Sequence, residues 1–429
     1  MTPLKQPATL ASAIALPEVS LLRPAARLGL RARNDPGVAI AALALAVGAV
    51  YVWVVSPGLP ADEPSHWSTV LYYVYHERMP VLGDPGVSYE AQMGPVAYVL
   101  DGTLVRASRG IGLSLALSFR LVRLLGVVEL SAMVLVVLAL TKRLVPTSSS
   151  LFAAVAVFAL NPMLLCMSGS IQNDTLALLL SVLALYMAVL CLSDRPTNGA
   201  AILVGVVAGL AVLTKLTAWA VVLAIPAWLI WRHRRRGLGP VLAFLGSALL
   251  VSGWWFVRNM VLYGDPTAAA GVRKTGVSFA PYHVHGANGL AHIAEEMVTY
   301  LWLPTEYVRN LISAPSVLKA ALLGATIVVG LAGIGSARRL SGLSPLVVGS
   351  GVVSVVSWLV TYLGVQAVAF RVAYVVLPLW VCLMALALAR LPARAGIALT
   401  GLVVIGINAW TLYELSRVVA PVFISLSSG

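Results

Sequence analysis

The sequence predicts an all-α, polytopic integral membrane protein with about eleven transmembrane helices. First, 60% of its 429 residues are hydrophobic and only 10% are charged, whereas a water-soluble domain has roughly a quarter charged residues. Second, apolar runs long enough to cross a bilayer recur from residue 37 almost to the C-terminus. Third, the basic residues fall in short clusters between these runs. These observations favour one membrane domain over several soluble ones.

The chain divides into a basic cytoplasmic tail (1–36), a transmembrane domain (37–415) and an external tail (416–429). The predicted spans are 37–56, 118–140, 150–167, 174–193, 200–214, 216–231, 240–262, 316–336, 343–363, 367–389 and 395–415. Little polar sequence separates the fifth span from the sixth, so one long tilted helix is the alternative there.

Charge decides between these alternatives. If the N-terminus is cytoplasmic and the two spans are separate, the basic clusters between spans all face the cytoplasm, as the positive-inside rule requires. These clusters are Lys142/Arg143, Arg195, Arg232 to Arg236, Arg338/Arg339 and Arg390/Arg394. The long loops 57–117 and 263–315 are then external, and the first contains two amphipathic stretches suited to helices in the membrane interface. We therefore expect a multi-pass protein of the cytoplasmic (inner) membrane, with its polar chemistry on the external face.

The net charge of +13 arises from 29 Lys and Arg against 16 Asp and Glu. Because these cations cluster beside apolar runs, they indicate contact with anionic membrane lipids, and no nucleic acid is expected as a partner. The three cysteines lie in or beside apolar runs without metal-ligand or redox spacing. They are expected to be small buried residues.

The segment PGLPADEPSHW (57–67) places Asp62 and Glu63 between prolines just after the first span. A carboxylate near the lipid boundary has its pKa raised by desolvation unless a cation or metal offsets this, and such a group suits a general base. The alternative is a solvated turn in which Asp62 caps a helix that begins near Ser65. His66 follows one turn later and suits a metal or a phosphate, although a lone loop histidine usually binds neither.

The same loop contains YEAQMGPVAY, in which Tyr89, Glu90 and Gln92 present phenol, acid and amide groups. These groups suit contacts to a sugar or a phosphate. A glutamate at a helix N-terminus is equally explained by the helix dipole.

Asn173 and Asp174 precede a fully apolar run in SIQNDTLALLL. Either one is an ordinary helix cap, but Asp174 would also be a second acid on the same side as Asp62. Lys215 lies between two apolar runs and emerges externally, where it either pairs with a phosphate or reaches the lipid headgroups.

The segment GWWFVRNMVLYGDP (253–266) carries Arg258, Asn259 and Tyr263 at the external end of the seventh span. Arg258 is too deep for a loop charge and needs a carboxylate or phosphate partner. Arg371, at the external start of the tenth span, either adds to a cationic pocket or anchors a helix end. Together with the carboxylates, these cations predict a site for an anionic lipid headgroup.

In this order, the motifs DEPSHW, YEAQMGP, QND, GLAVLTKLTA and WWFVRNMVLYGDP resemble the integral membrane glycosyltransferases of the GT-C superfamily. The nearest branch is the bacterial family 39 type, related to protein O-mannosyltransferases and aminoarabinose transferases. The resemblance covers residues 37–270. It implies a transferase that moves a sugar, with inversion, from a polyprenyl-phosphate donor to an external lipid, glycan or protein acceptor.

The resemblance also implies roles for residues. Asp62 corresponds to the base, with Glu63 as the adjacent acid. Lys215, Arg258 and Arg371 are assigned to the donor phosphate, mainly because of their positive charge rather than because of a matching motif. Substrate contacts are then expected from His66, Tyr89, Glu90, Gln92, Asn173, Asp174, Asn259 and Tyr263. Some relatives use a divalent cation such as Mg²⁺, Mn²⁺ or Zn²⁺, for which the candidate ligands are Asp62, Asp174 and His66.

Two other classes of protein compete with this interpretation. A transporter or flippase would recognise the same anionic lipid-linked sugar without chemistry, but it predicts inverted repeats, and none is visible. A structural subunit would carry the same residues as interfacial anchors, which requires the external carboxylates to lie far apart.

Overall fold

The computed structural model describes residues 35–76, 78–275, 286–336, 338, 340, 344–364 and 369–418. Most of the predicted N-terminal tail and nearly all of the C-terminal tail lie outside these ranges. The described residues are mostly helical and include no β-strand. The predicted all-α polytopic class is therefore confirmed.

The helices are, in chain order, α2 (Pro36–Val54), α3 (Glu63–Tyr75), η3 (Tyr89–Gln92), α4 (Val96–Gly110), α5 (Leu115–Thr141), α6 (Ser149–Ala159), α7 (Pro162–Ser168), α8 (Asp174–Leu192), α9 (Asn198–Thr214), η4 (Leu216–Ala218), α10 (Trp219–His233), η5 (Arg234–Gly237), α11 (Leu238–Tyr263), α12 (Ala269–Lys274), α13 (Gly286–Trp302), α14 (Ser316–Ile334), α15 (Ser344–Gly364), η7 (Phe370–Val376), α16 (Leu377–Leu388) and α17 (Ala393–Ser416).

Eight helical stretches of the described residues are long and apolar enough to cross a membrane, or nine if α6 and α7 form one broken span. The predicted number of about eleven spans is not confirmed. The differences are local. At 17 residues, α9 is shorter than a full span, and the 48-residue apolar stretch Leu216–Tyr263 counts once although η5 divides it into α10 and α11.

The predicted span 150–167 is bent by 49° between α6 and α7. Asn161 caps α7, since its Oδ1 accepts hydrogen bonds from the backbone N–H groups of Met163 and Leu164. Pro162 follows this cap and has no N–H to continue the α6 hydrogen-bond ladder. The Asn161–Pro162 pair therefore explains the break between α6 and α7.

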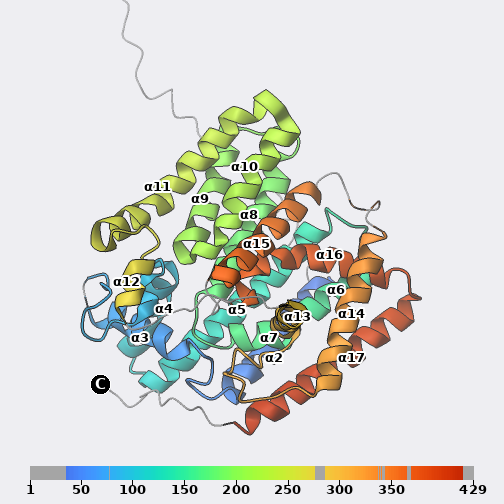
Figure 1. Ribbon diagram of the computed structural model, residues 1–429, viewed down its shortest axis with the longest axis horizontal. Helices are drawn as coiled ribbons and strands as arrows, with labels where there is room; N and C mark the ends of the chain where they lie inside the picture. The colour runs from blue at the N-terminus through green and yellow to red at the C-terminus, as the bar shows by residue number, and fades with distance from the viewer. Residues whose placement is uncertain are drawn as a thin grey trace, which may run out of the picture.

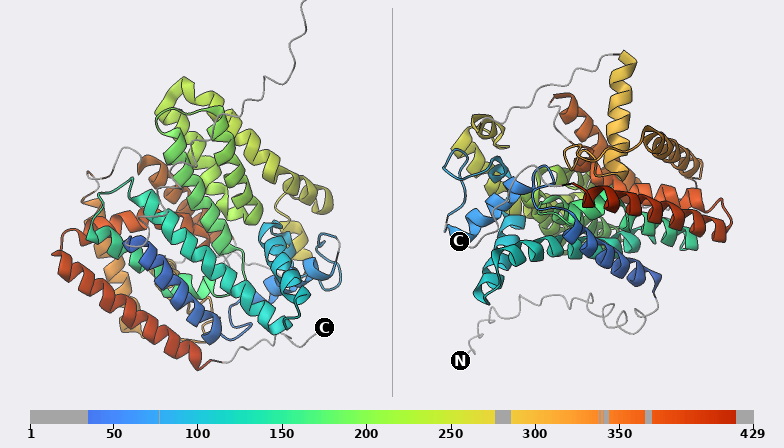
Figure 2. Two further views of the ribbon diagram at one scale, coloured as in Figure 1. Left: turned by 180° about the vertical axis from the view of Figure 1, so that it is seen from behind. Right: turned by 90° about the horizontal axis from the view of Figure 1, so that it is seen from below.

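Helices α8, α9, α10 and α11 pack together at one side of the molecule (Figure 1). Glycines allow α9 to approach α11 closely: a Cβ atom on Gly205 would lie only 2.4 Å from the Phe244 carbonyl oxygen. α13 projects away from the other helices (Figure 2). α14 is mostly exposed, as a lipid-facing helix would be.

The first long loop forms α3, η3 and α4, which lie beside α12 at one end of the molecule (Figure 1). Trp67 of α3, Tyr98 of α4 and Phe119 of α5 are buried in one apolar cluster, with the Trp67 and Phe119 rings edge to face at 5.1 Å. The two predicted amphipathic stretches are therefore helical. Their placement in a membrane interface stays a prediction.

Candidate active site

A cavity of about 370 Å³ lies where the first loop, the α9–α10 junction, the end of α11 and η7 meet. Its charged and titratable lining residues are Asp62, His66, Tyr89, Glu90, Lys215 and Arg371. Its apolar and aromatic lining includes Met93, Val212, Trp219, Trp255 and Phe256. A polar end beside an apolar wall matches a ligand that has both a charged group and a hydrocarbon part.

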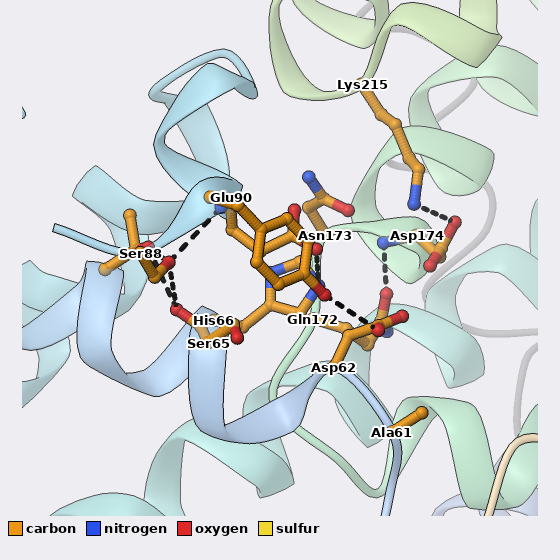
Figure 3. Close-up of polar contacts among 12 residues, drawn as sticks. Ala61, Asp62, Ser65, His66, Ser88, Glu90, Gln172, Asn173, Asp174 and Lys215 are labelled. Carbon is orange, nitrogen blue, oxygen red and sulfur yellow. Dashed lines mark hydrogen bonds and ion pairs between the residues drawn. The ribbon is translucent and has the colours of Figure 1, made fainter. Parts of the chain in front are cut away.

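Asp62 lies at the N-cap position of α3, yet its side chain makes no capping hydrogen bond. The helix begins at Glu63 rather than near Ser65. The Asp62 carboxylate instead accepts hydrogen bonds from the Tyr89 hydroxyl at 3.0 Å and from Nη2 of Arg371. The side-chain capping alternative is therefore wrong, and Asp62 faces the cavity (Figure 3).

Arg371 connects the two acids of the site. Its Nη1 lies 3.4 Å from Oδ2 of Asp174, while its Nη2 binds Asp62. Asp174 also pairs with Lys215, whose Nζ is 2.7 Å from Oδ1 (Figure 3). The guanidinium lies 5.0 Å from the centre of the Tyr307 ring. Two carboxylates and two cations thus form one buried network whose formal charges cancel.

The surroundings of the first-loop acids set their charge. Burial acts to raise the pKa of Asp62, but the charge and hydrogen bond of Arg371, together with His66 and Lys215, hold that pKa well below its usual range. Burial and the charge of Asp62 raise the pKa of Glu90 to about 8. Burial lowers the pKa of His66 to about 3. At neutral pH, Asp62 is therefore ionised, His66 is neutral and Glu90 is largely protonated.

Asp62, His66 and Glu90 each offer a ligand atom within 4.8 Å of the others. Nδ1 of His66 contacts the Tyr98 hydroxyl at 2.8 Å, which leaves Nε2 on the side of Glu90, 3.8 Å from its Oε1. Oε2 of Glu90 is buried without a hydrogen-bond partner among the described residues. One imidazole, two carboxylates and an unpartnered oxygen fit a divalent cation.

This group differs from the predicted ligand set in one member. Asp174 was expected as a ligand but lies outside this group: its Oδ1 pairs with Lys215, while its Oδ2 lies 3.4 Å from Nη1 of Arg371 and has no hydrogen-bond partner among the described residues. Glu90, expected as a substrate contact, takes that place in the group.

Glu63 points away from the cavity and is fully buried. Its carboxylate accepts hydrogen bonds from Nε and Nη2 of Arg123 at 2.7 and 2.6 Å, and from the backbone N–H groups of Gly58 and Ile171. Arg123 also donates to the Val55 carbonyl at 2.6 Å. Glu63 therefore ties the Asp62 turn to α5 and to the segment before α8. Sequence reasoning missed Arg123, although an arginine inside an apolar span signals a buried acid partner.

Arg258 and Tyr263 hold the first loop rather than line the cavity. Nη2 of Arg258 donates to the Pro80 carbonyl at 2.7 Å, and the Tyr263 hydroxyl accepts from the Leu82 N–H at 3.0 Å. The partner of the deep arginine is thus a backbone carbonyl and the Trp255 ring, which lies 4.8 Å from its guanidinium.

The remaining predicted contacts are divided between the cavity and its walls. Asn259 lines the cavity, and its buried Oδ1 has no hydrogen-bond partner among the described residues. Gln92 also lines the cavity, and its backbone carbonyl accepts a hydrogen bond from Nε1 of Trp255 at 3.2 Å. Asn173 is fully buried behind the cavity, where its Nδ2 donates to the Thr214 carbonyl.

The structure is a helical membrane domain with a charged cavity beside its first long loop. Comparisons of the chain with protein families and with solved structures find proteins of the same kind. A sequence profile of the family described as "Dolichyl-phosphate-mannose-protein mannosyltransferase" matches residues 111–255. No curated protein sequence matches the chain.

Two solved structures share the fold. One is the archaeal oligosaccharyltransferase AglB from Archaeoglobus fulgidus in complex with an inhibitory peptide and a dolichol-phosphate, with a TM-score of 0.53 and 15% identity over 89% of this chain and 55% of that one. The other is ArnT from Cupriavidus metallidurans bound to undecaprenyl phosphate, with a TM-score of 0.54 and 13% identity over 88% of this chain and 73% of that one. The chain has the fold of the GT-C superfamily, and it spans about half the length of AglB.

Proposed function

We propose that the protein is a membrane glycosyltransferase that moves a sugar, with inversion, from a polyprenyl-phosphate donor to an acceptor outside the cytoplasmic membrane. The observation that carries the proposal is the cavity in which Asp62 faces Lys215 and Arg371 beside an aromatic wall. The fold adds support, because the matched AglB and ArnT structures hold dolichol-phosphate and undecaprenyl phosphate.

The two cations suit the phosphate of the sugar donor. Lys215 and Arg371 are paired with carboxylates in this structure, so a donor phosphate would compete for cations that are already in place. Charge-assisted contacts of this kind also stabilise the charge that develops on a departing phosphate. The apolar wall of Trp219, Trp255 and Phe256 suits the isoprenoid part of the same molecule.

Asp62 suits the proton transfer. The acceptor oxygen attacks the anomeric carbon, the bond from that carbon to the phosphate oxygen breaks, and the acceptor proton passes to the Asp62 carboxylate. In this structure, Arg371 keeps Asp62 a weak base. A donor phosphate that draws Arg371 toward itself would weaken this hold and make Asp62 more basic as the substrates assemble.

A divalent cation is part of the proposal. Asp62, His66 and Glu90 would hold it, and when bound it would add positive charge beside the donor phosphate. Binding of the donor phosphate and stabilisation of its charge are assigned to Lys215 and Arg371.

The proposed orientation places the cavity outside and the N-terminus in the cytoplasm. α10 and α11 each run between the cavity and the exposed arginines of η5, so Lys215 and Asn259 lie at the ends opposite Arg234 to Arg236. The positive-inside rule assigns the η5 end to the cytoplasm.

Product formation from a labelled polyprenyl-phosphate sugar by the purified protein in detergent tests this function. Asp62→Asn should abolish sugar transfer while membrane expression and thermal stability stay near those of the wild type. A fully active Asp62→Asn variant would exclude the assignment. Movement of the intact lipid across vesicles without product would favour a transporter instead.

A further inference from the structure

A short segment after α13, residues 305–310, holds the backbone next to Asp62. The Ala61 N–H donates to the Tyr307 carbonyl at 2.9 Å, and Nη2 of Arg309 donates to the Ala61 carbonyl at 2.7 Å. Both backbone polar groups of the residue before Asp62 are therefore fixed by one segment of a distant loop. Figure 3 shows Ala61 in the backbone segment that leads into Asp62.

The same segment also contacts Arg371 and the part of the chain that leads to Asp174, two of the other three members of the ion network. The buried Tyr307 ring lies under the Arg371 guanidinium, 5.0 Å from its carbon to the ring centre. The Tyr307 hydroxyl contacts Oγ of Ser170 at 2.6 Å, in the segment that leads to Asp174. The side chain of Tyr307 thus touches two of the four chain segments that carry the network, and its backbone carbonyl holds a third.

The backbone of this segment is unusual and firmly fixed. Arg309 and Asn310 have φ values of 59° and 55°, a left-handed conformation that non-glycine residues rarely adopt. The Asn310 N–H donates to the Thr305 carbonyl at 2.8 Å, which closes the turn. Such strain persists only where the surroundings determine the conformation, and it is concentrated at functional sites. The strained turn directs the Arg309 side chain to Ala61.

We propose that Arg309 and Tyr307 are positioning residues for sugar transfer: Arg309 fixes Asp62 through the Ala61 backbone, and Tyr307 fixes Arg371 through its ring. This inference rests on the proposed function. Neither residue lines the cavity, so each acts on the substrates only through the group that it holds.

The two residues have different kinetic signatures. Arg309→Ala releases the Asp62 turn but leaves Arg371 on Tyr307, so turnover should fall about tenfold or more while the KM for the sugar donor changes little. Tyr307→Leu removes the ring beneath Arg371, so the donor KM should rise. Tyr307→Phe keeps the ring and should keep the wild-type donor KM. Arg309→Lys retains one donor group and should recover part of the turnover.

Lys319→Ala is the matched control, because it removes a cation that pairs with Glu295 and does not line the cavity. It should leave both constants unchanged. Hydrogen–deuterium exchange of residues 57–67 gives a second measurement that needs no activity. Exchange at this turn should increase in Arg309→Ala and not in Lys319→Ala.

Two results would overturn the inference: wild-type turnover in Arg309→Ala, or unchanged exchange of residues 57–67 in that variant. A parallel loss of turnover and donor affinity in Arg309→Ala would also contradict it, because that pattern indicates general destabilisation. If the wild-type protein transfers no sugar, the proposed function fails, and the exchange measurement still decides whether Arg309 holds the turn.

Discussion

Arg371 donates a hydrogen bond to the carboxylate of Asp62, which lies 309 residues earlier in the chain. The contact joins the first loop to η7 and gives the site a resting state in which acids and cations satisfy one another. A donor phosphate that enters the site would compete with Asp62 and Asp174 for these cations.

Lys215 and Arg258 should differ in their effect on the sugar donor. Lys215→Met removes a cation that lines the cavity, and the loss of a charge-assisted contact should weaken binding of polyprenyl phosphate by about tenfold or more. Arg258→Met should leave this affinity unchanged, because Arg258 binds the Pro80 carbonyl and does not line the cavity. Titration of the purified variants with a fluorescent polyprenyl phosphate measures both. Equal weakening in the two variants would restore Arg258 as a phosphate ligand.

Glu63 should matter for stability rather than for the chemical step. Glu63→Gln leaves the guanidinium of Arg123 buried without its carboxylate, and breaking such a pair costs about 3–5 kcal/mol. Thermal unfolding in detergent should show this loss. The double variant Glu63→Gln/Arg123→Met should be more stable than Glu63→Gln, because it removes the unpaired charge. A Glu63→Gln variant that unfolds like the wild type but transfers no sugar would show a catalytic role instead.

The helical class follows from apolar runs, since each predicted span is occupied by helix in the described chain. Asp62, His66, Glu90, Lys215 and Arg371 share one cavity, and sequence reasoning selected each because a polar group beside an apolar run needs an explanation. Charge and burial were therefore enough to indicate which residues to consider.

The sequence could not predict which group each charged side chain contacts. Glu63 and Asp62 are neighbours, yet one turns toward Arg123 and the other toward Arg371, which only the entry of α3 into the bundle decides. Arg258 was expected to meet a carboxylate or phosphate, but its Nη2 donates to a backbone carbonyl of the first loop, and its buried Nη1 has no hydrogen-bond partner among the described residues. Tyr307 gave no signal, because it lies in a loop and acts through its ring and its carbonyl.

Gly94 should be intolerant of any side chain. A Cβ atom there would lie 1.7 Å from the Leu213 carbonyl oxygen, so Gly94→Ala must push the first loop away from the end of α9 and from Lys215. We expect a loss of about 1–3 kcal/mol in stability, with reduced transfer. Gly246→Ala is the control, since a Cβ atom there meets nothing within 4 Å. Melting temperatures and transfer rates should be lower for Gly94→Ala than for Gly246→Ala. Similar values would show that the backbone near Leu213 moves to accept a Cβ atom at position 94 at little cost.

Glu90 should make the protein less stable as pH rises toward 8. Burial, followed by the charge of Asp62, raises its pKa from the usual 4.5 to about 8 in the folded protein. Between these values the folded state keeps a proton that the unfolded state has lost, so the free energy of unfolding falls with pH, by up to about 1.4 kcal/mol per unit. Glu90→Gln cannot titrate and should lack this component. Thermal unfolding of both proteins from pH 5 to 8, with a chelator present to exclude metal binding, measures the difference. Identical pH profiles would mean that the pKa of Glu90 is not raised in the folded protein, and the prediction would be wrong.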